Sequence, residues 1–203
     1  MYKRMVWVSL FLVSVLVMAG CAPTVSKGYS ADYVFKSAGM TMRGKMYFAG
    51  DKWRTETKGA IRGTPGYGKP VISIARADKK VIWIIMPDQK MYMEREMDVA
   101  ELRSYMVKMP GETERKKVGS EKVSGIMCDK YKVTFKYGEG MRPETMYQWL
   151  SRDNIPVKTV AADGSWSSVY TNIKRGRQPA SLFELPAGYK KWEMPKMPSM
   201  PKF

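Results

Sequence analysis

The chain has 203 residues, 44% of them apolar and 27% charged, which is enough for one domain with a buried core. It carries 35 basic against 19 acidic residues, a formal net charge of +16, with 2 Cys and no His. The missing histidines exclude Ser-His-Asp and Cys-His catalysis and the usual zinc sites. We therefore expect neither a cofactor, nor a metal, nor an enzymatic activity.

Residues 1–20 have the parts of a secretory signal. Two basic residues precede an apolar run from Val6 to Met18, which is shorter than the roughly 20 residues of a membrane span. Residues 17–21, Val-Met-Ala-Gly-Cys, resemble the lipobox of bacterial lipoprotein signals. The resemblance implies cleavage before Cys21 and attachment of several acyl chains, palmitate among them, to that cysteine. An ordinary signal peptide or an uncleaved anchor are the alternatives.

The residues after the cleavage point indicate where the protein is held. Residues 21–30 read as the lipidated cysteine and a short flexible tether. Ala22 stands where lipoproteins retained at the inner membrane commonly have Asp. We therefore expect a lipid anchor at the outer membrane on its periplasmic face, with the inner membrane as the alternative.

An alternation of apolar and polar residues dominates the stretch after the tether, residues 31–192. Such a period of two is typical of strands with one buried and one wet face. It is clearest in two stretches, where Met40, Met42, Met46 and Phe48 alternate with polar residues and where Met127, Tyr131, Val133 and Phe135 alternate with lysines. The other predicted strands span residues 32–38, 52–58, 70–76, 80–86, 89–95, 114–122, 144–151, 155–161 and 165–174. Turn residues between them predict an antiparallel meander.

The glycine-rich stretch from Gly63 to Pro70 matches seven positions of a phosphate-binding P-loop. The eighth position, which should be Ser or Thr, is Pro70, and an apolar strand follows where a helix should begin. We interpret this stretch as a loop between strands.

One amphipathic helix is predicted over residues 98–109. Asp98 caps it, Glu101 stands three residues later, and Leu102 and Met106 belong to its apolar stripe. Strand 80–86 is apolar on both alternating sets of positions, so we expect it to be covered on both faces, with this helix over one of them. A second short helical turn is predicted at Ala180–Phe183.

The second cysteine, Cys128, has no partner once Cys21 is acylated. It lies in an apolar stretch, and we predict a buried core position for it rather than a reactive thiol. The tail, residues 193–203, is rich in Pro and Met and reads as a frayed end.

Basic residues cluster in three places. An exported protein meets little nucleic acid, so an anionic envelope surface is the expected partner for them, and a solvated surface without a partner is the alternative. The basic surface comprises Arg115, Lys116, Lys117, Lys130, Lys132, Lys136, Lys174, Arg175 and Arg177.

Methionines are abundant, 18 in the chain. They serve either as gap-filling core residues or as an adaptable lining for an apolar ligand. The candidate lining comprises Met40, Met42, Met46, Phe48, Trp83, Met91, Met93, Leu102 and Met106.

Three segments in order resemble the LolA/LolB-like superfamily of periplasmic lipoprotein-sorting and lipid-binding proteins, in its uncharacterised lipoprotein branch. They are residues 44–54, the Pro-Asp hairpin of residues 81–92, and residues 182–190. The resemblance implies a mainly β protein with a few helices, a half-open antiparallel β-barrel covered by a helical lid. It also implies that the protein binds a lipid or acyl chain without catalysis and takes part in lipid or lipoprotein trafficking, and we expect a monomer. It makes Arg54 a candidate for an arginine that contacts the lid.

A structural or regulatory envelope protein stays open as the alternative function. Such a protein would have a filled interior and no small-molecule ligand. It would contact anionic partners through the basic surface.

Overall fold

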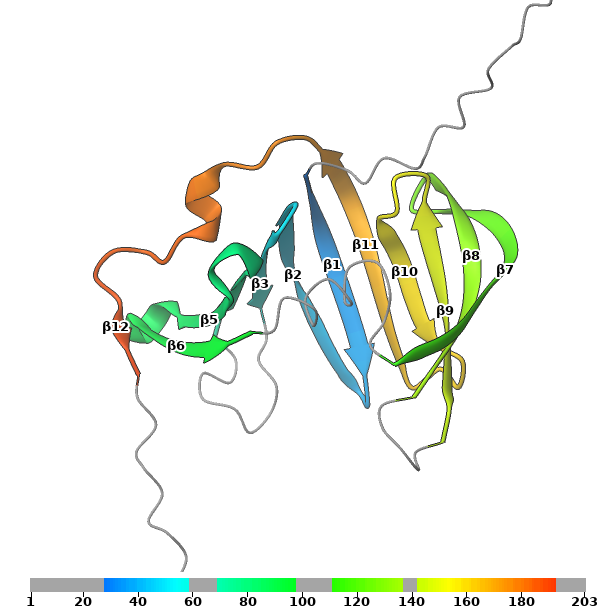
Figure 1. The fold of residues 1–203 in the computed structure, drawn as a ribbon, viewed down its shortest axis with the longest axis horizontal. Helices are drawn as coiled ribbons and strands as arrows, with labels where there is room; N and C mark the ends of the chain where they lie inside the picture. Colours follow the sequence, from blue (N-terminus) through cyan, green and yellow to red (C-terminus); the bar gives the residue numbers. More distant parts are fainter. Residues whose placement is uncertain (1–27, 59–68, 98–110, 137–141, 193–203) are drawn as a thin grey trace, which may run out of the picture.

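The computed structural model describes residues 28–58, 69–97, 111–136 and 142–192. They form one 12-stranded sheet in the order β12-β6-β5-β4-β3-β2-β1-β11-β10-β9-β8-β7 (Figure 1). The strands are β1 Tyr29–Ser37, β2 Met40–Ala49, β3 Lys52–Lys58, β4 Val71–Arg76, β5 Val81–Met86, β6 Met91–Glu96, β7 Glu112–Val123, β8 Ile126–Phe135, β9 Glu144–Ser151, β10 Pro156–Ala161, β11 Trp166–Arg175 and β12 Lys190–Lys191.

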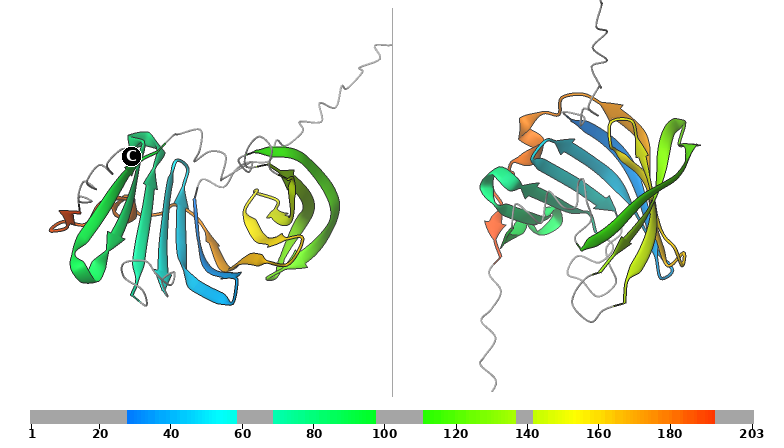
Figure 2. Two further views of the ribbon diagram at one scale, coloured as in Figure 1. Left: turned by 90° about the horizontal axis from the view of Figure 1, so that it is seen from below. Right: turned by 45° about the vertical axis from the view of Figure 1, so that its right-hand side comes forward.

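Every neighbouring pair is antiparallel except β12 with β6, which is parallel. Figure 2 shows that the sheet spreads out from β1 toward β6 and curls over on the side of β7 to β10. The sheet does not close, because β12 and β7 are its two edges within the described residues. The predicted mainly β, open antiparallel architecture is therefore confirmed.

The helices in the described residues are short 3-10 turns: η1 Ala77–Lys79, η2 Pro87–Gln89 and η3 Ala180–Phe183. The last coincides with the helical turn predicted from the sequence. The helix predicted over residues 98–109 lies outside the described residues, and no helical lid is seen among those that are described. Within them, no helix has the length and apolarity needed to cross a membrane.

Strand register divides the sheet into two faces, because residues directly opposite each other on neighbouring strands point to the same side. One face, called the methionine face here, carries the column Met46, Thr55, Ser73, Ile84 and Met93 across β2 to β6. The other, called the strap face, carries the column Tyr47, Arg54, Ile74, Trp83 and Glu94.

The C-terminal strap, residues 176–192, leaves β11 and covers the strap face of β3 to β5. Phe183 is fully buried in a cluster with Ile74, Trp83 and Ile85. Leu182, Leu185 and Tyr189 pack around the same cluster. The strap thus supplies the second cover that the doubly apolar strand β5 requires, from a segment about a hundred residues further along the chain. The sequence analysis placed residues 98–109 over one face of β5, and those residues lie outside the described part of the chain.

Two further clusters fill the curled side of the sheet. Val133, Phe135 and Met146 are buried together on the methionine face. Cys128 packs with Trp149 and Val157 on the opposite face and is 1% exposed. The predicted core position of this cysteine is therefore confirmed, and burial raises the pKa of its thiol.

Candidate ligand-binding face

Most of the predicted lining residues share the methionine face. Alternation places Met40, Met42, Met46 and Phe48 on one side of β2, and the register carries that side across to Met91 and Met93 on β6. Met46 and Phe48 are buried, whereas the other four methionines are only partly covered. Leu102 and Met106 lie outside the described residues.

Trp83 is the exception and corrects the sequence analysis. It pairs with Ile74 and Glu94, so its ring lies on the strap face, where it is 8% exposed beneath the C-terminal strap. Its indole N–H donates to a carboxylate oxygen of Glu94 at 3.0 Å. Because every residue of β5 is apolar, alternation alone could not assign a side to Trp83.

Aromatic side chains that the sequence analysis did not single out complete the methionine face. Phe35 pairs with Met42 and stacks on Trp166 at a ring distance of 6.2 Å. Trp53 pairs with Phe48 and packs against the cluster of Met46 and Tyr29. Phe35 and Tyr33 are two residues apart in β1 and therefore point to the same side. The period of two in the sequence could thus have identified Phe35 as a residue of this face.

Polar tips lie among these rings. The hydroxyl groups of Tyr33 and Thr57 are hydrogen bonded. Burial raises the pKa of Tyr170 to about 12, with Tyr33 adding to the effect. Trp53 differs from both, because its buried indole N–H has no hydrogen-bond partner among the described residues. An unpaired buried donor costs about 1–3 kcal/mol, so this position favours an acceptor that arrives from outside the described residues.

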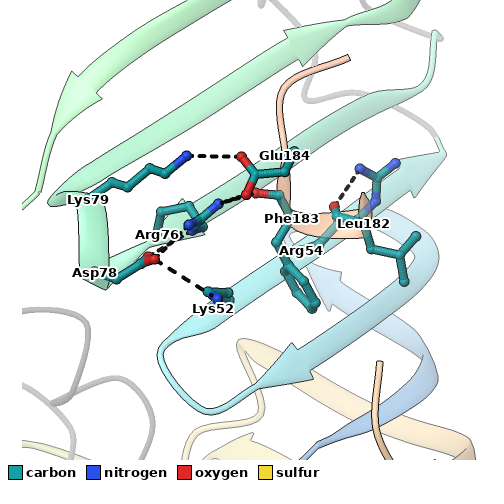
Figure 3. Close-up of polar contacts among 8 residues, drawn as sticks. All are labelled: Lys52, Arg54, Arg76, Asp78, Lys79, Leu182, Phe183 and Glu184. Carbon is teal, nitrogen blue, oxygen red and sulfur yellow. Dashed lines mark hydrogen bonds and ion pairs between the residues drawn. The ribbon is translucent and has the colours of Figure 1, made fainter. Parts of the chain in front are cut away.

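Arg76 holds the C-terminal strap to the strap face (Figure 3). Its side chain is 4% exposed and makes a two-pronged contact with Asp78, at 2.7 Å from Nε and 2.6 Å from Nη2. Its Nη1 donates to the carbonyl oxygen of Phe183 at 3.0 Å and pairs with Glu184. The strap is thus fixed by charge as well as by apolar contact.

Two neighbouring contacts support this attachment. Lys79 lies 3.0 Å from Glu184, and the hydrogen bonds from Lys79 and Arg76 lower the pKa of that carboxyl. Arg54, the candidate lid-contacting arginine, donates from Nη1 to the carbonyl oxygen of Leu182 at 3.0 Å. Arg54 therefore contacts a covering segment, and that segment is the C-terminal strap.

Several members of the predicted basic surface are neutralised by acidic partners. Arg115 pairs with Glu112 at 2.8 Å and also donates to Gln148. Lys117 pairs with Asp129 at 2.8 Å, and Arg175 pairs with Asp153 at 2.7 Å. Asp129 and Asp153 are distant in sequence from the basic residues they pair with, so a count of basic residues overestimates the free charge.

The remaining basic residues are more open. Lys116 and Lys132 face each other across β7 and β8, and both are exposed. Lys130 lies 4.8 Å from the centre of the Trp149 ring, which Lys158 approaches to 4.5 Å. Lys136, Lys174 and Arg177 are also exposed.

Residues 33–165 match the model of one protein family, described as Domain of unknown function (DUF4412). The chain belongs to this family. The match runs from β1 to the turn before β11, so the DUF4412 region contains both the methionine face and Arg76. No curated protein matches this DUF4412 chain in sequence.

Solved structures share the fold of this DUF4412 protein at low identity. MucB superposes with a TM-score of 0.50 and 16% identity, over 79% of this chain and 58% of MucB. Lipoprotein LppX of Mycobacterium tuberculosis gives 0.42 and 13%, over 73% and 88% of the two chains. LprF of Mycobacterium bovis gives 0.44 and 10%, over 79% and 90%. The chain spans less than three fifths of the length of MucB.

A domain from Vibrio parahaemolyticus, named for outer membrane lipoprotein sorting, also matches, with a TM-score of 0.32 and 10% identity, over 76% of this chain and 88% of that one. Two lipoproteins and a lipoprotein-sorting domain are thus among the solved structures that this chain resembles.

Proposed function

We propose that this DUF4412 protein is an envelope lipoprotein that binds a lipid or another apolar ligand on its methionine face. Residues 1–20 act as the export signal, and acylated Cys21 anchors the protein at the outer membrane through the tether, residues 21–30. The domain of residues 31–192 holds the ligand, and residues 193–203 form a tail. No cofactor or catalytic step is part of the proposal.

The observation that carries the proposal is the incomplete cover of an apolar face. Met40, Met42 and Met93 are only partly buried, whereas Met46 and Phe48 on the same face are buried. Methionine side chains adapt their shape to irregular apolar partners. Each CH₂ group of an acyl chain placed against such a face contributes about 0.8 kcal/mol when it leaves water.

Trp53 adds a polar contact to this face. Its buried N–H has no partner, and it stands between Phe48 and Ala75 in the strand register. An ester or amide oxygen of an acylated ligand would satisfy this donor. A pure hydrocarbon would leave the donor unpaired.

The direct experiment is to purify the acylated protein from native membranes and identify lipids that stay bound after detergent exchange. Mass spectrometry of the intact complex should find about one lipid for each protein molecule. A ligand-free protein that also fails to bind a fluorescent fatty acid would contradict the proposal.

Neighbouring residues on β2 provide a matched pair of variants. Met42→Glu places a charge on the methionine face, and we expect it to weaken fluorescent fatty-acid binding at least about tenfold, because burial of an unpaired carboxylate is costly. Thr41→Glu adds the same charge to the opposite face, where Thr41 is exposed, and should leave binding unchanged. Thermal unfolding of both variants controls for loss of the fold. Equal losses of binding would remove the methionine face as the site.

A second candidate function rests on the lysines that line the strap-face side of β7 to β10. Lys116 and Lys132 are adjacent and exposed, and Lys130 and Lys158 lie over Trp149. This surface suits an anionic envelope partner. Sedimentation with vesicles at low and high salt tests it, since charge-driven binding should fail with neutral lipid and fall as salt rises.

A further inference from the structure

Exposed apolar residues are concentrated on one hairpin. Among the described residues, the large hydrophobic side chains that stand out into solvent are Val118, 45% exposed, and Met127, 65% exposed. Both belong to the hairpin of β7 and β8: Met127 follows its turn at Ser124 and Gly125 directly, whereas Val118 lies in the middle of β7. Isolated exposed apolar residues are common on proteins. Whether these residues indicate a contact surface therefore depends on where they lie in the fold.

The hairpin turn lies at the end of the sheet where the described chain begins. Tyr29 pairs with Arg175, and the backbone N–H of Gly176 donates to the carbonyl oxygen of Gly28 at 3.0 Å. Arg175 also pairs with Asp153 in the turn between β9 and β10. Figure 1 shows the start of β1, the arrowhead of β11 and this turn at one end of the sheet.

The register then leads from that turn to Met127. Ser151, at the end of β9, pairs with Cys128, which is the next residue after Met127 in β8. Met127 itself pairs with Lys122 of β7. The entry of the chain and the exposed Met127 therefore share one end of the sheet.

The proposed anchor is close to this end. Seven residue steps separate Cys21 from Gly28, and an extended chain spans at most about 3.3–3.6 Å for each residue. The membrane surface is then within about 25 Å of Gly28. A strand of ten residues is itself about 33 Å long. The tether therefore holds the Gly28 end of the sheet nearer to the lipid, on average, than the opposite end.

Exposed cations lie at the same end of the sheet as Met127. Lys122 faces Met127 across the hairpin, and Arg152 lies in the turn between β9 and β10. Lys174 and Arg177 flank the point where the chain enters the sheet, and both are exposed. Each basic residue close to an anionic bilayer contributes about 1 kcal/mol to its attraction.

We propose that this end of the sheet rests on an anionic phospholipid surface, with Met127 in the headgroup region and Lys122, Arg152, Lys174 and Arg177 against lipid phosphates. This docking rests on the proposed anchor at Cys21. It orients the strands toward the membrane and leaves the turn between β1 and β2 pointing into the periplasm.

Depth measurement in reconstituted vesicles tests the orientation. Two variants of the acylated full chain, Met127→Cys and Thr41→Cys, are each labelled with an environment-sensitive fluorophore. Thr41 is the matched control, because it lies at the start of β2, at the opposite end of the sheet. Cys128 stays unlabelled because it is buried and its thiol pKa is raised. The vesicles contain phosphatidylethanolamine and phosphatidylglycerol with a fraction of spin-labelled lipid that quenches the fluorophore.

We expect quenching at position 127 to exceed that at position 41 at least threefold. Equal quenching at the two positions, or stronger quenching at position 41, overturns the docking. The mass of the Cys21 peptide is read on the same sample and reports acylation separately. A protein without added acyl mass contradicts the anchor, whereas an acylated protein with equal quenching contradicts only the orientation.

Discussion

At the scale of single residues, Arg76 and Trp53 show opposite ways of burying a nitrogen donor. Arg76 is 4% exposed and has Asp78, Glu184 and the Phe183 carbonyl as partners, while the indole N–H of Trp53 has none. The sequence placed Trp53 on a strand but could not show its missing partner. It could not show the partners of Arg76 either, because Glu184 is more than a hundred residues away.

Arg76→Ala should lower the free energy of unfolding by about 3 kcal/mol, because it removes a buried charge that its partners need for their own hydrogen bonds. Urea denaturation measures this loss. Lys79→Ala removes an exposed partner of the same Glu184 and should cost less than about 1 kcal/mol. Similar losses for the two variants would show that Arg76 is no more important than a surface ion pair.

Trp53→Phe should change the free energy of unfolding by less than about 1 kcal/mol, because the relief of a buried N–H without a partner among the described residues offsets the packing lost with the smaller ring. Its effect should be seen with ligand, as a several-fold weaker affinity for a fatty-acid ester and an unchanged affinity for an alkane of the same length. Fluorescence competition measures both. A large loss of stability without ligand would indicate an internal partner for this donor.

At the scale of elements, the period of two predicted most strands well. Residues 52–58 and 144–151 form strands with the predicted bounds, and η3 occupies the predicted Ala180–Phe183. The wrong face predicted for Trp83 comes from β5. Every residue of this strand is apolar, so the pattern cannot show which side chains lie beneath the strap. That choice depends on Phe183 and its neighbours, whose contact with β5 is long-range.

Phe183→Ala tests the division between the two faces. Phe183 is fully buried, so we expect a loss of about 3–4 kcal/mol in the free energy of unfolding. Fatty-acid binding by the fraction that stays folded should be unchanged, because Phe183 covers the strap face. Calorimetry and probe titration at low temperature measure the two effects. Strongly weakened binding in the folded variant would connect the strap to the ligand site.

At the scale of the whole molecule, pairs between arginines and carboxylates make the free energy of unfolding depend on pH. Hydrogen bonds from Arg175 lower the pKa of Asp153, and those from Arg76 lower the pKa of Asp78. A carboxyl whose pKa is lower in the folded state stabilises the protein above its unfolded pKa of about 4, and this stabilisation is lost as pH falls through the folded pKa.

The urea midpoint should therefore be nearly constant between about pH 6 and 8, since the chain has no histidine, and should fall as pH decreases from about 5 to 3. Asp153→Asn should make the acid side of this profile shallower. A step in stability near pH 6.5 would require a titrating group that the described residues do not supply.

The two edges of the open sheet are not equivalent. At one, the two residues of β12 pair with Met91 and Tyr92 of β6, whereas β7 is the last strand on the other side of the described sheet. A short edge strand such as β12 offers little backbone for pairing with another copy. The register breaks and lysines of β7 oppose pairing at the other edge, so neither side of the described sheet favours growth of copies into fibres.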